Sequence, residues 1–168
     1  LQSDPNIQHV AAGLQAMDCV IVQDLFLNET ARYAHVFLPG ATFLEKDGTF
    51  TNGERRINRV RKVMAPKAGY ADWEITQLLA NEMGADWEYT HPSQIMDEVA
   101  ATTPSFAGVS FDLLDEMGSV QWPCNEDAPE GTPVMHVDEF VRGKGRFLIT
   151  EYIPTDEKTG PRFPLLLT

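Results

Sequence analysis

Two short apolar runs near the start of the chain, each preceded by a segment of helical character, constrain the fold most. The runs are residues 19–22 (Cys-Val-Ile-Val) and 36–38 (Val-Phe-Leu), and each has the length of a strand. Continuous runs of this kind are typical of strands buried on both faces of a parallel sheet. Residues 4–16 begin with an Asp-Pro pair suited to a helix start and then space their apolar side chains as a helix does, and residues 29–34 predict a short helical turn. This alternation of helix and strand predicts a doubly wound α/β layer.

A turn-rich, basic segment follows at residues 45–62. Its Asp47-Gly48 and Asn52-Gly53 pairs are strong turn dipeptides, so we expect the backbone to reverse here and form a hairpin. Five positive charges then occur within eight residues of a chain whose formal net charge is -12 (Arg55, Arg56, Arg59, Arg61 and Lys62). Positive charge concentrated on an acidic protein indicates an anionic contact such as a phosphate, a carboxylate or an acidic neighbour, and a solvated basic hairpin is the alternative.

The middle of the chain predicts further helices. Asp72 precedes an apolar stripe that ends at Gly84, which predicts a helix over residues 72–83 with Asp72 as its N-cap. The patterns that follow predict two short amphipathic helices, at residues 93–101 and 110–117. They also predict a surface loop at residues 120–131.

The last part of the chain predicts a second hairpin and a final strand. Apolar residues 140–141 and 147–149 flank Arg-Gly-Lys-Gly-Arg at 142–146, which is typical of a hairpin with a basic tip. Residues 151–162 read as a polar linker to a buried strand at 163–168. Because a strand is a poor place for a natural terminus, we expect the chain to be a piece of a larger polypeptide.

Several kinds of chemistry are absent from the sequence. It has no GxGxxG motif, no P-loop and no CxxC pair, and its four histidines are scattered, so we predict no catalytic residue and no metal ligand in this chain. The acidic net charge argues against nucleic acid as a partner, and no run approaches the ~18 apolar residues of a membrane helix. Cys19 opens an apolar run and is expected to be a buried thiol. Without a disulfide framework, we expect a reducing, cytoplasmic location.

The segment from Glu45 to Arg56, Glu-Lys-Asp-Gly-Thr-Phe-Thr-Asn-Gly-Glu-Arg-Arg, resembles the signature of the molybdopterin oxidoreductase superfamily in its formate dehydrogenase branch. Stretches similar to formate dehydrogenase catalytic subunits occur in the same order at residues 1–4, 20–26, 29–34, 36–39, 72–73 and 118–124. Stretches similar to the alpha subunit of soluble, NAD-dependent molybdenum formate dehydrogenases occur at residues 130–136, 142–145 and 150–168. The resemblance covers essentially the whole chain.

This resemblance implies an activity for the intact subunit. It would oxidise formate to CO2 at a molybdenum or tungsten ion held by two molybdopterin guanine dinucleotides. Iron–sulfur clusters held elsewhere in the subunit would pass electrons to a flavin-containing partner subunit that reduces NAD. The residues that ligate the metal and act on formate lie upstream in that family, which agrees with the lack of catalytic residues here.

For this chain the resemblance implies part of a Rossmann-like domain that holds one guanine dinucleotide, with flanking helices and a basic hairpin insertion. Residues 1–90 would be part of the dinucleotide-binding domain and residues 91–150 its helical and hairpin extension. Residues 151–168 would be a linker and the first strand toward a C-terminal barrel domain. The residues carried over as cofactor contacts are Ser3, Gln23, Asp24, Gly40 and Asp72.

Each of these residues also has a purely structural interpretation. Asp72 could act only as an N-cap, and Gly40 could serve only a turn after Pro39. Gln23 and Asp24 could simply end a strand, although two polar groups at the carboxyl end of a parallel strand favour ligand contact. Ser3 fits an ordinary helix lead-in.

Two other identities for the whole protein remain open at this point. One is the pterin-free large iron–sulfur subunit of NADH dehydrogenase, which would have no use for Gln23, Asp24 and Asp72 as cofactor contacts. The other is a nitrate reductase catalytic subunit, which shares the Glu-Lys-x-Gly and Glu-Arg-Arg pattern. A stand-alone α/β binding module is the remaining possibility.

Overall fold

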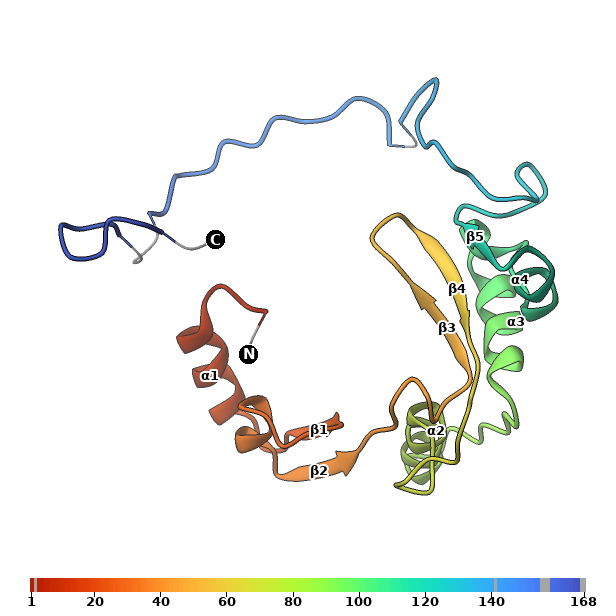
Figure 1. The fold of residues 1–168 in the computed structure, drawn as a ribbon, viewed down its shortest axis with the longest axis horizontal. Helices are drawn as coiled ribbons and strands as arrows, with labels where there is room; N and C mark the ends of the chain where they lie inside the picture. Colours follow the sequence, from red (N-terminus) through yellow and green to blue (C-terminus); the bar gives the residue numbers. More distant parts are fainter. Residues whose placement is uncertain (2, 141, 155–157, 167–168) are drawn as a thin grey trace. The chain divides into compact units, whose positions relative to one another are not determined.

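The chain divides into two compact units in a computed structural model that describes residues 1, 3–140, 142–154 and 158–166. The first unit is Leu1–Pro133 and the second is Val134–Thr168. All helices and strands that the described residues form lie in the first unit, in the order shown in Figure 1. No helix in the described ranges is long and apolar enough to cross a bilayer.

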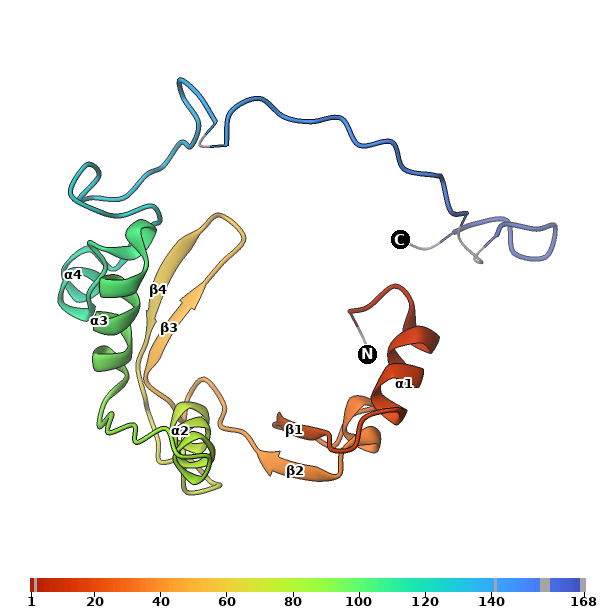
Figure 2. The ribbon, with the colours of Figure 1, turned by 180° about the vertical axis from the view of Figure 1, so that it is seen from behind.

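The first unit begins with the predicted pair of parallel strands. Strand β1 (Ile21–Asp24) lies beside β2 (Val36–Pro39) in parallel, in a register that pairs Ile21 with Val36 and Asp24 with Pro39 (Figures 1 and 2). Helix α1 (Ile7–Gln15) precedes β1, and a 3-10 turn, η1 (Thr30–Tyr33), connects the strands. The predicted α/β alternation is confirmed. The predicted burial on both faces is wrong, since Ile21 is 46% exposed and Val36 is 44% exposed.

Helix α1 begins two residues later than the sequence predicted. Asn6 is its N-cap, and the Asn6 side chain accepts a hydrogen bond from the His9 amide at 3.2 Å. Asp4 instead accepts from the Asn6 amide at 2.9 Å, so it supports the capping residue without capping the helix itself. The Asp-Pro pair therefore lies outside the helix.

The basic segment forms the predicted hairpin and joins a three-stranded antiparallel sheet. The turn of the hairpin lies at Asn52-Gly53 as predicted, whereas the turn predicted at Asp47-Gly48 is wrong, because Gly48 is the first residue of a strand. Strands β3 (Gly48–Thr51) and β4 (Arg56–Val60) pair with each other, and β4 also pairs with β5 (Ser119–Gln121). Helix α4 (Phe111–Met117) packs on β4 and β5. Helix α3 (Pro92–Thr102) and a 3-10 turn, η2 (Pro104–Phe106), contribute side chains to the same hydrophobic cluster.

The core of the first unit lies between this sheet and helices α3 and α4. Its fully buried side chains include Ile57 of β4, Leu114 of α4 and Val120 of β5. The predicted surface loop at 120–131 is therefore wrong at its start. Cys124 is also fully buried, whereas Cys19 is exposed, which reverses the prediction for Cys19.

Helix α2 (Asp72–Glu82) starts at Asp72, and Ala71 in an extended conformation is the N-cap position. The predicted capping role of Asp72 is wrong, because its carboxylate binds groups outside the helix. None of the residues of α2 is buried in this chain. The apolar stripe of the helix is present but largely open to solvent, with Leu78 49% exposed and Leu79 40% exposed.

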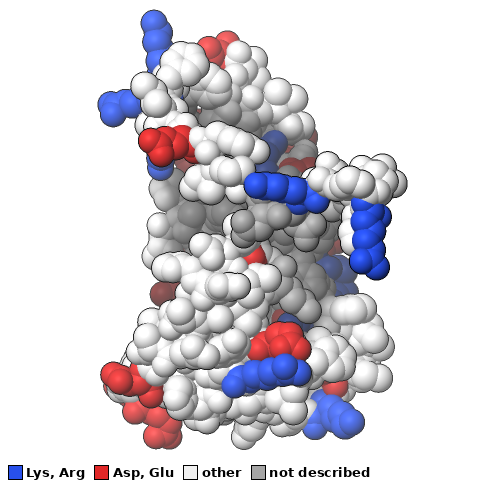
Figure 3. All heavy atoms as spheres, turned by 90° about the vertical axis from the view of Figure 1, so that its left-hand side faces the viewer, with Lys and Arg blue, Asp and Glu red and all other residues white. Residues whose placement is uncertain are grey.

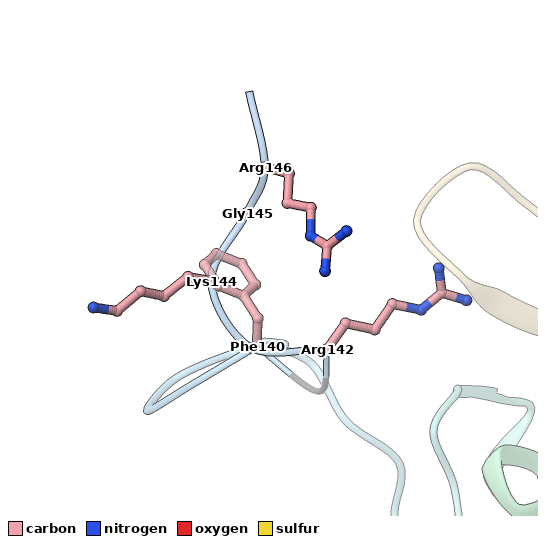
Figure 4. Close-up of a pocket in the computed structure, with 6 residues that line it drawn as sticks. Phe140, Arg142, Lys144, Gly145 and Arg146 are labelled. Atoms are coloured by element: carbon pink, nitrogen blue, oxygen red, sulfur yellow. The ribbon is translucent and has the colours of Figure 1, made fainter. Parts of the chain in front are cut away.

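The second unit contains no helix or strand among its described residues. The predicted hairpin around residues 142–146 is not formed, and Phe147 and Ile149 are completely exposed. Figure 4 shows that the side chains of Arg142 and Arg146 extend to one side of the backbone and that of Lys144 to the other. Val141, Leu167 and Thr168, which belong to predicted strands, lie outside the described residues. The predicted domain division at residues 90 and 150 stays a prediction.

Candidate functional site

The site is built where the two parallel strands end. Gln23 and Asp24 are the last residues of β1, and Gly40 directly follows β2. Because the strands are parallel and Asp24 pairs with Pro39, all three residues meet at one edge of the sheet. The Gly40 amide donates to the Asp24 carbonyl at 2.9 Å, which continues the ladder past the end of β2.

Asp72 joins this edge from the start of α2. Its Oδ1 accepts from the Gln23 side-chain amide at 3.1 Å and from the Ala41 backbone amide at 3.1 Å. Its Oδ2 accepts from the Lys46 ammonium, which also forms an ion pair with it. One carboxylate therefore links three separate parts of the chain: the end of β1, the residue after Gly40 and the segment that leads into the hairpin.

The Asp72 carboxylate is ionised in this setting. Its partial burial on its own would raise its pKa, but the hydrogen bonds from Lys46 and from the Ala41 amide, together with the Lys46 charge, lower the pKa overall. The Asp72 side chain is 33% exposed and the Lys46 side chain 26% exposed, so this ion pair is partly shielded from water.

Asp24 is held in one orientation by its neighbours. Its Oδ1 accepts from the Leu25 amide at 2.6 Å, and its Oδ2 accepts from the Asn28 side-chain amide at 2.7 Å. A carboxylate oxygen can accept about two hydrogen bonds, so each oxygen keeps one acceptor position. Asp24 is therefore oriented by the protein and still able to accept from N–H or O–H groups of a ligand.

An open hollow of about 460 Å³ lies beside this edge. It is lined by Leu25, Phe26, Pro39, Gly40, Thr42, Glu45, Lys67 and Ala68. Phe26 is 75% exposed and offers an aromatic surface, while Lys67 offers a positive charge. This combination suits a ligand that has both a flat ring and an anionic group.

The sequence reasoning missed Glu45, which shapes one wall of the hollow. This residue is only 8% exposed, and its carboxylate accepts from the Thr42 and Lys67 amides, both at 2.8 Å. These hydrogen bonds lower the pKa of Glu45, and the bond from the Thr42 amide has the largest effect. The signal was available, because Thr42-x-x-Glu45 has the spacing of a capping box.

Ser3 is the one predicted site residue that the structure does not bring to this edge through any contact. It is exposed, and within the described ranges no hydrogen bond joins it to Gln23, Asp24, Gly40 or Asp72. The described residues also contain no group of three or more His, Cys, Asp or Glu side chains placed to hold a metal ion.

Comparison with known proteins places the chain in a family. Residues 1–82 match the model of the molybdopterin oxidoreductases. An F420-dependent formate dehydrogenase alpha subunit from Methanococcus maripaludis is 44% identical over 171 residues, covering 99% of this chain and 25% of that protein. A protein provisionally named as a formate dehydrogenase from Staphylococcus haemolyticus is 51% identical over 146 residues, covering 85% of this chain and 14% of that protein.

The chain belongs to the molybdopterin oxidoreductase family. Membership in this family implies a molybdopterin cofactor with its metal, and the similarity to formate dehydrogenases extends along nearly the whole chain. The chain spans only about a quarter or less of the length of these relatives.

A solved structure supports the fold. Acetylene hydratase from Pelobacter acetylenicus superimposes with a TM-score of 0.54 at 23% sequence identity, covering 77% of this chain and 19% of that chain. At this level of identity the similarity concerns the fold alone. The mixed arrangement of parallel and antiparallel strands is thus shared with that enzyme.

Two arginines of the basic hairpin bind partners within the first unit. The Arg59 side chain is 6% exposed and donates to Asp47 at 2.6 Å and to Asp115 at 3.0 Å, while its guanidinium lies 3.8 Å from the centre of the Phe111 ring. Arg55 donates to the Thr132 and Pro133 carbonyls at 3.0 and 3.1 Å. Among the described residues, the anionic contacts of this segment therefore include two acidic side chains of the same unit, Asp47 and Asp115.

Proposed function

We propose that the protein to which this chain belongs is the catalytic alpha subunit of a formate dehydrogenase that oxidises formate to CO2. The proposal rests chiefly on the 44% identity with a formate dehydrogenase alpha subunit along 99% of the chain. The cofactor proposed is molybdenum or tungsten held by two molybdopterin guanine dinucleotides. When bound, the metal centre would take up the two electrons that formate loses.

The role proposed for this chain is to hold one of the guanine dinucleotides. Gln23, Asp24, Gly40 and Asp72 would form the contact edge, with Ser3 as a further contact. The shape at Gly40 supports the fit, since a Cβ built there would lie 2.9 Å from Asp72 Oδ1 and 3.3 Å from the Asp24 carbonyl carbon. Glycine at this position therefore lets the ends of the parallel strands and the start of α2 pack closely enough to form one contact edge.

The donors and acceptors of the edge also support the fit. Asp24 keeps acceptor positions that suit the N–H groups of guanine or the hydroxyls of ribose. Asp72 is occupied by Gln23, Ala41 and Lys46, so its main task would be to fix the positions of Gln23 and Gly40. No catalytic residue is assigned to this chain.

The electron acceptor is a finer part of the proposal. Iron–sulfur clusters elsewhere in the subunit would pass the electrons to a flavin-containing partner subunit that reduces NAD. The Methanococcus maripaludis relative is named as F420-dependent, so F420 is the second candidate acceptor. We place the protein in the cytoplasm, with no nucleic acid and no membrane as a partner.

The test uses the full-length protein with its partner subunits. We expect molybdenum or tungsten by elemental analysis, formate-dependent reduction of an artificial dye, and reduction of NAD. Reduction of F420 in place of NAD would keep the formate assignment and replace the acceptor. Iron without molybdenum or tungsten, and no formate oxidation, would assign the protein to the pterin-free NADH dehydrogenase relatives. Nitrate reduction without formate oxidation would assign it to the nitrate reductases.

A further inference from the structure

A second hollow shares no lining residue with the hollow beside Gly40, and none of the proposed cofactor contacts lines it. It has a volume of about 380 Å³, within the range of about 300–1,000 Å³ that ligand pockets occupy. Residues of α2, of the segment 87–89 and of α3 line it: Trp73, Thr76, Gln77, Trp87, Tyr89, Ile95, Glu98, Val99 and Thr102. We call it the aromatic groove.

One wall of the aromatic groove is fixed by two side chains of α2. The Gln77 side chain forms two hydrogen bonds with the backbone of Tyr89: it donates to the carbonyl at 3.0 Å and accepts from the amide at 2.9 Å. Asn81, one helical turn later, binds the backbone of Trp87 in the same way: it donates to the carbonyl at 2.8 Å and accepts from the amide at 2.6 Å. These four bonds hold the segment 87–89 against α2 as a neighbouring strand would be held. The wall is therefore preformed, which lowers the entropic cost of binding.

The rings that this wall presents are placed edge to face. The Trp87 and Tyr89 ring centres are 6.0 Å apart with planes at 61°, and Trp87 is 42% exposed. The Tyr89 hydroxyl donates to the Glu98 carboxylate on α3, which joins the two sides of the groove. The groove thus combines aromatic surface with a carboxylate at its edge.

The charged side chains of the segments that form the aromatic groove are all acidic. No Lys or Arg occurs between Lys67 and Arg142, while the residues from the end of α2 through α3 include Glu82, Asp86, Glu88, Asp97 and Glu98. Among the described residues, none of these five carboxylates forms an ion pair. A set of uncompensated like charges attracts cationic groups and repels phosphates and carboxylates.

We propose that the aromatic groove docks a basic polypeptide segment of a partner protein, which inserts one apolar side chain between Trp87 and Val99 and places Lys or Arg side chains against the carboxylates around it. Aromatic faces add to this preference, since cations are attracted to them. An acidic or phosphorylated segment does not fit. The inference is independent of the proposed function, because it uses neither the parallel strands nor the cofactor.

The test is a titration of the full-length protein with a capped peptide, Lys-Lys-Leu-Lys-Lys. Isothermal calorimetry measures the Kd at a low and a high salt concentration. The comparison peptides are Glu-Glu-Leu-Glu-Glu and Lys-Lys-Ser-Lys-Lys. We expect the first peptide to bind, its Kd to rise about tenfold between low and high salt, and the other two to bind much more weakly.

Three variants locate the binding. Thr102→Trp places a large ring in the groove from the exposed end of α3 and should abolish binding. Glu88→Lys should weaken it several-fold, because it reverses a charge beside the groove at a residue that does not line the hollow. Glu126→Lys, an equal charge change at an exposed position outside the groove, is the matched control and should bind like the parent. Glu88 is exposed, and its side chain forms no hydrogen bond or ion pair among those of the described residues, so we expect this variant to fold like the parent.

Several outcomes would overturn the proposal. The first is that the parent protein does not bind the peptide, as expected if another part of the same polypeptide covers the groove. The second is that all three peptides bind equally well. The third is that Glu88→Lys and Glu126→Lys lose the same amount of affinity for the peptide. Self-association that Thr102→Trp abolishes, without peptide binding, would assign the groove to a second copy of the protein and also reject the proposal.

Discussion

Gly40 and Asp72, 32 positions apart in the sequence, lie so close that a methyl group at position 40 would stand 2.9 Å from the Asp72 carboxylate. This contact fastens the start of α2 to the ends of the parallel strands. It also explains why a residue predicted to cap its own helix binds elsewhere: the Asp72 carboxylate is occupied by Gln23, Ala41 and Lys46.

Gly40→Ala tests this contact. The added methyl group must displace the Asp72 carboxylate or the Asp24 backbone, and overpacking of this kind costs about 1–3 kcal/mol. We expect a lower free energy of unfolding, measured by denaturant titration, and loss of bound cofactor from the full-length protein. Gly13→Ala is the control, because nothing lies within 4 Å of a Cβ there and alanine favours the helix. Equal stability of the two variants would contradict the contact.

Asp72→Asn tests the charge on the same residue. The folded-state pKa of Asp72 is lowered, so its contribution to stability is present above the unfolded-state pKa of about 3.9 and is lost as the pH falls through the folded-state value. We expect the parent protein to lose more stability on acidification through this range than Asp72→Asn does, as measured by thermal unfolding at a series of pH values. Identical pH profiles would show that Lys46 and Asp72 are not coupled.

Arg59→Met tests the attachment of the hairpin to α4. The change removes a nearly buried guanidinium from Asp47, Asp115 and the face of Phe111, and we expect a loss of about 1.5–3 kcal/mol in the free energy of unfolding. Arg61→Met is the control. Arg61 also contacts Asp115, but its side chain is 59% exposed, so a loss of at most about 1 kcal/mol is expected. A larger loss for Arg61→Met would reverse the roles assigned to the two arginines.

Glu45→Ala tests the wall of the hollow beside Gly40. Without the carboxylate, the Thr42 and Lys67 amides lose their acceptor, so their hydrogen exchange should become faster. The amides of β4 should keep their protection, because among the described residues the hydrogen bonds of the Glu45 carboxylate go to Thr42 and Lys67 and not to that strand. Unchanged exchange at Lys67 would mean that another group holds this loop in place.

The local patterns predicted much of this fold because they depend on neighbours in the sequence. The apolar runs of β1 and β2, the Asn52-Gly53 turn and the helices near residues 72, 93 and 110 all appear close to where the sequence placed them. Strand β5 was missed because its partner is β4, about 60 residues earlier, and its own three residues lie in a segment that resembles a loop.

The site could be predicted in part for the same reason. The position of Gln23, Asp24 and Gly40 follows from the parallel arrangement of two adjacent strands. The network around Asp72 does not, since Lys46 and Ala41 reach it through the tertiary fold. Burial was the least predictable property: Cys124 lies in the core between the sheet and the helices, while Cys19, two residues before β1, is exposed.

The most direct test of the central claim is the content of molybdenum or tungsten and of guanine nucleotide in the purified full-length protein and in Asp24→Ala. If Asp24 accepts hydrogen bonds from the cofactor, removing a charged acceptor worth about 1.5–3 kcal/mol should lower occupancy about tenfold or more, while the circular dichroism spectrum and unfolding temperature change little. Unchanged metal and nucleotide content in a folded Asp24→Ala protein would contradict the assignment of this edge as the cofactor site.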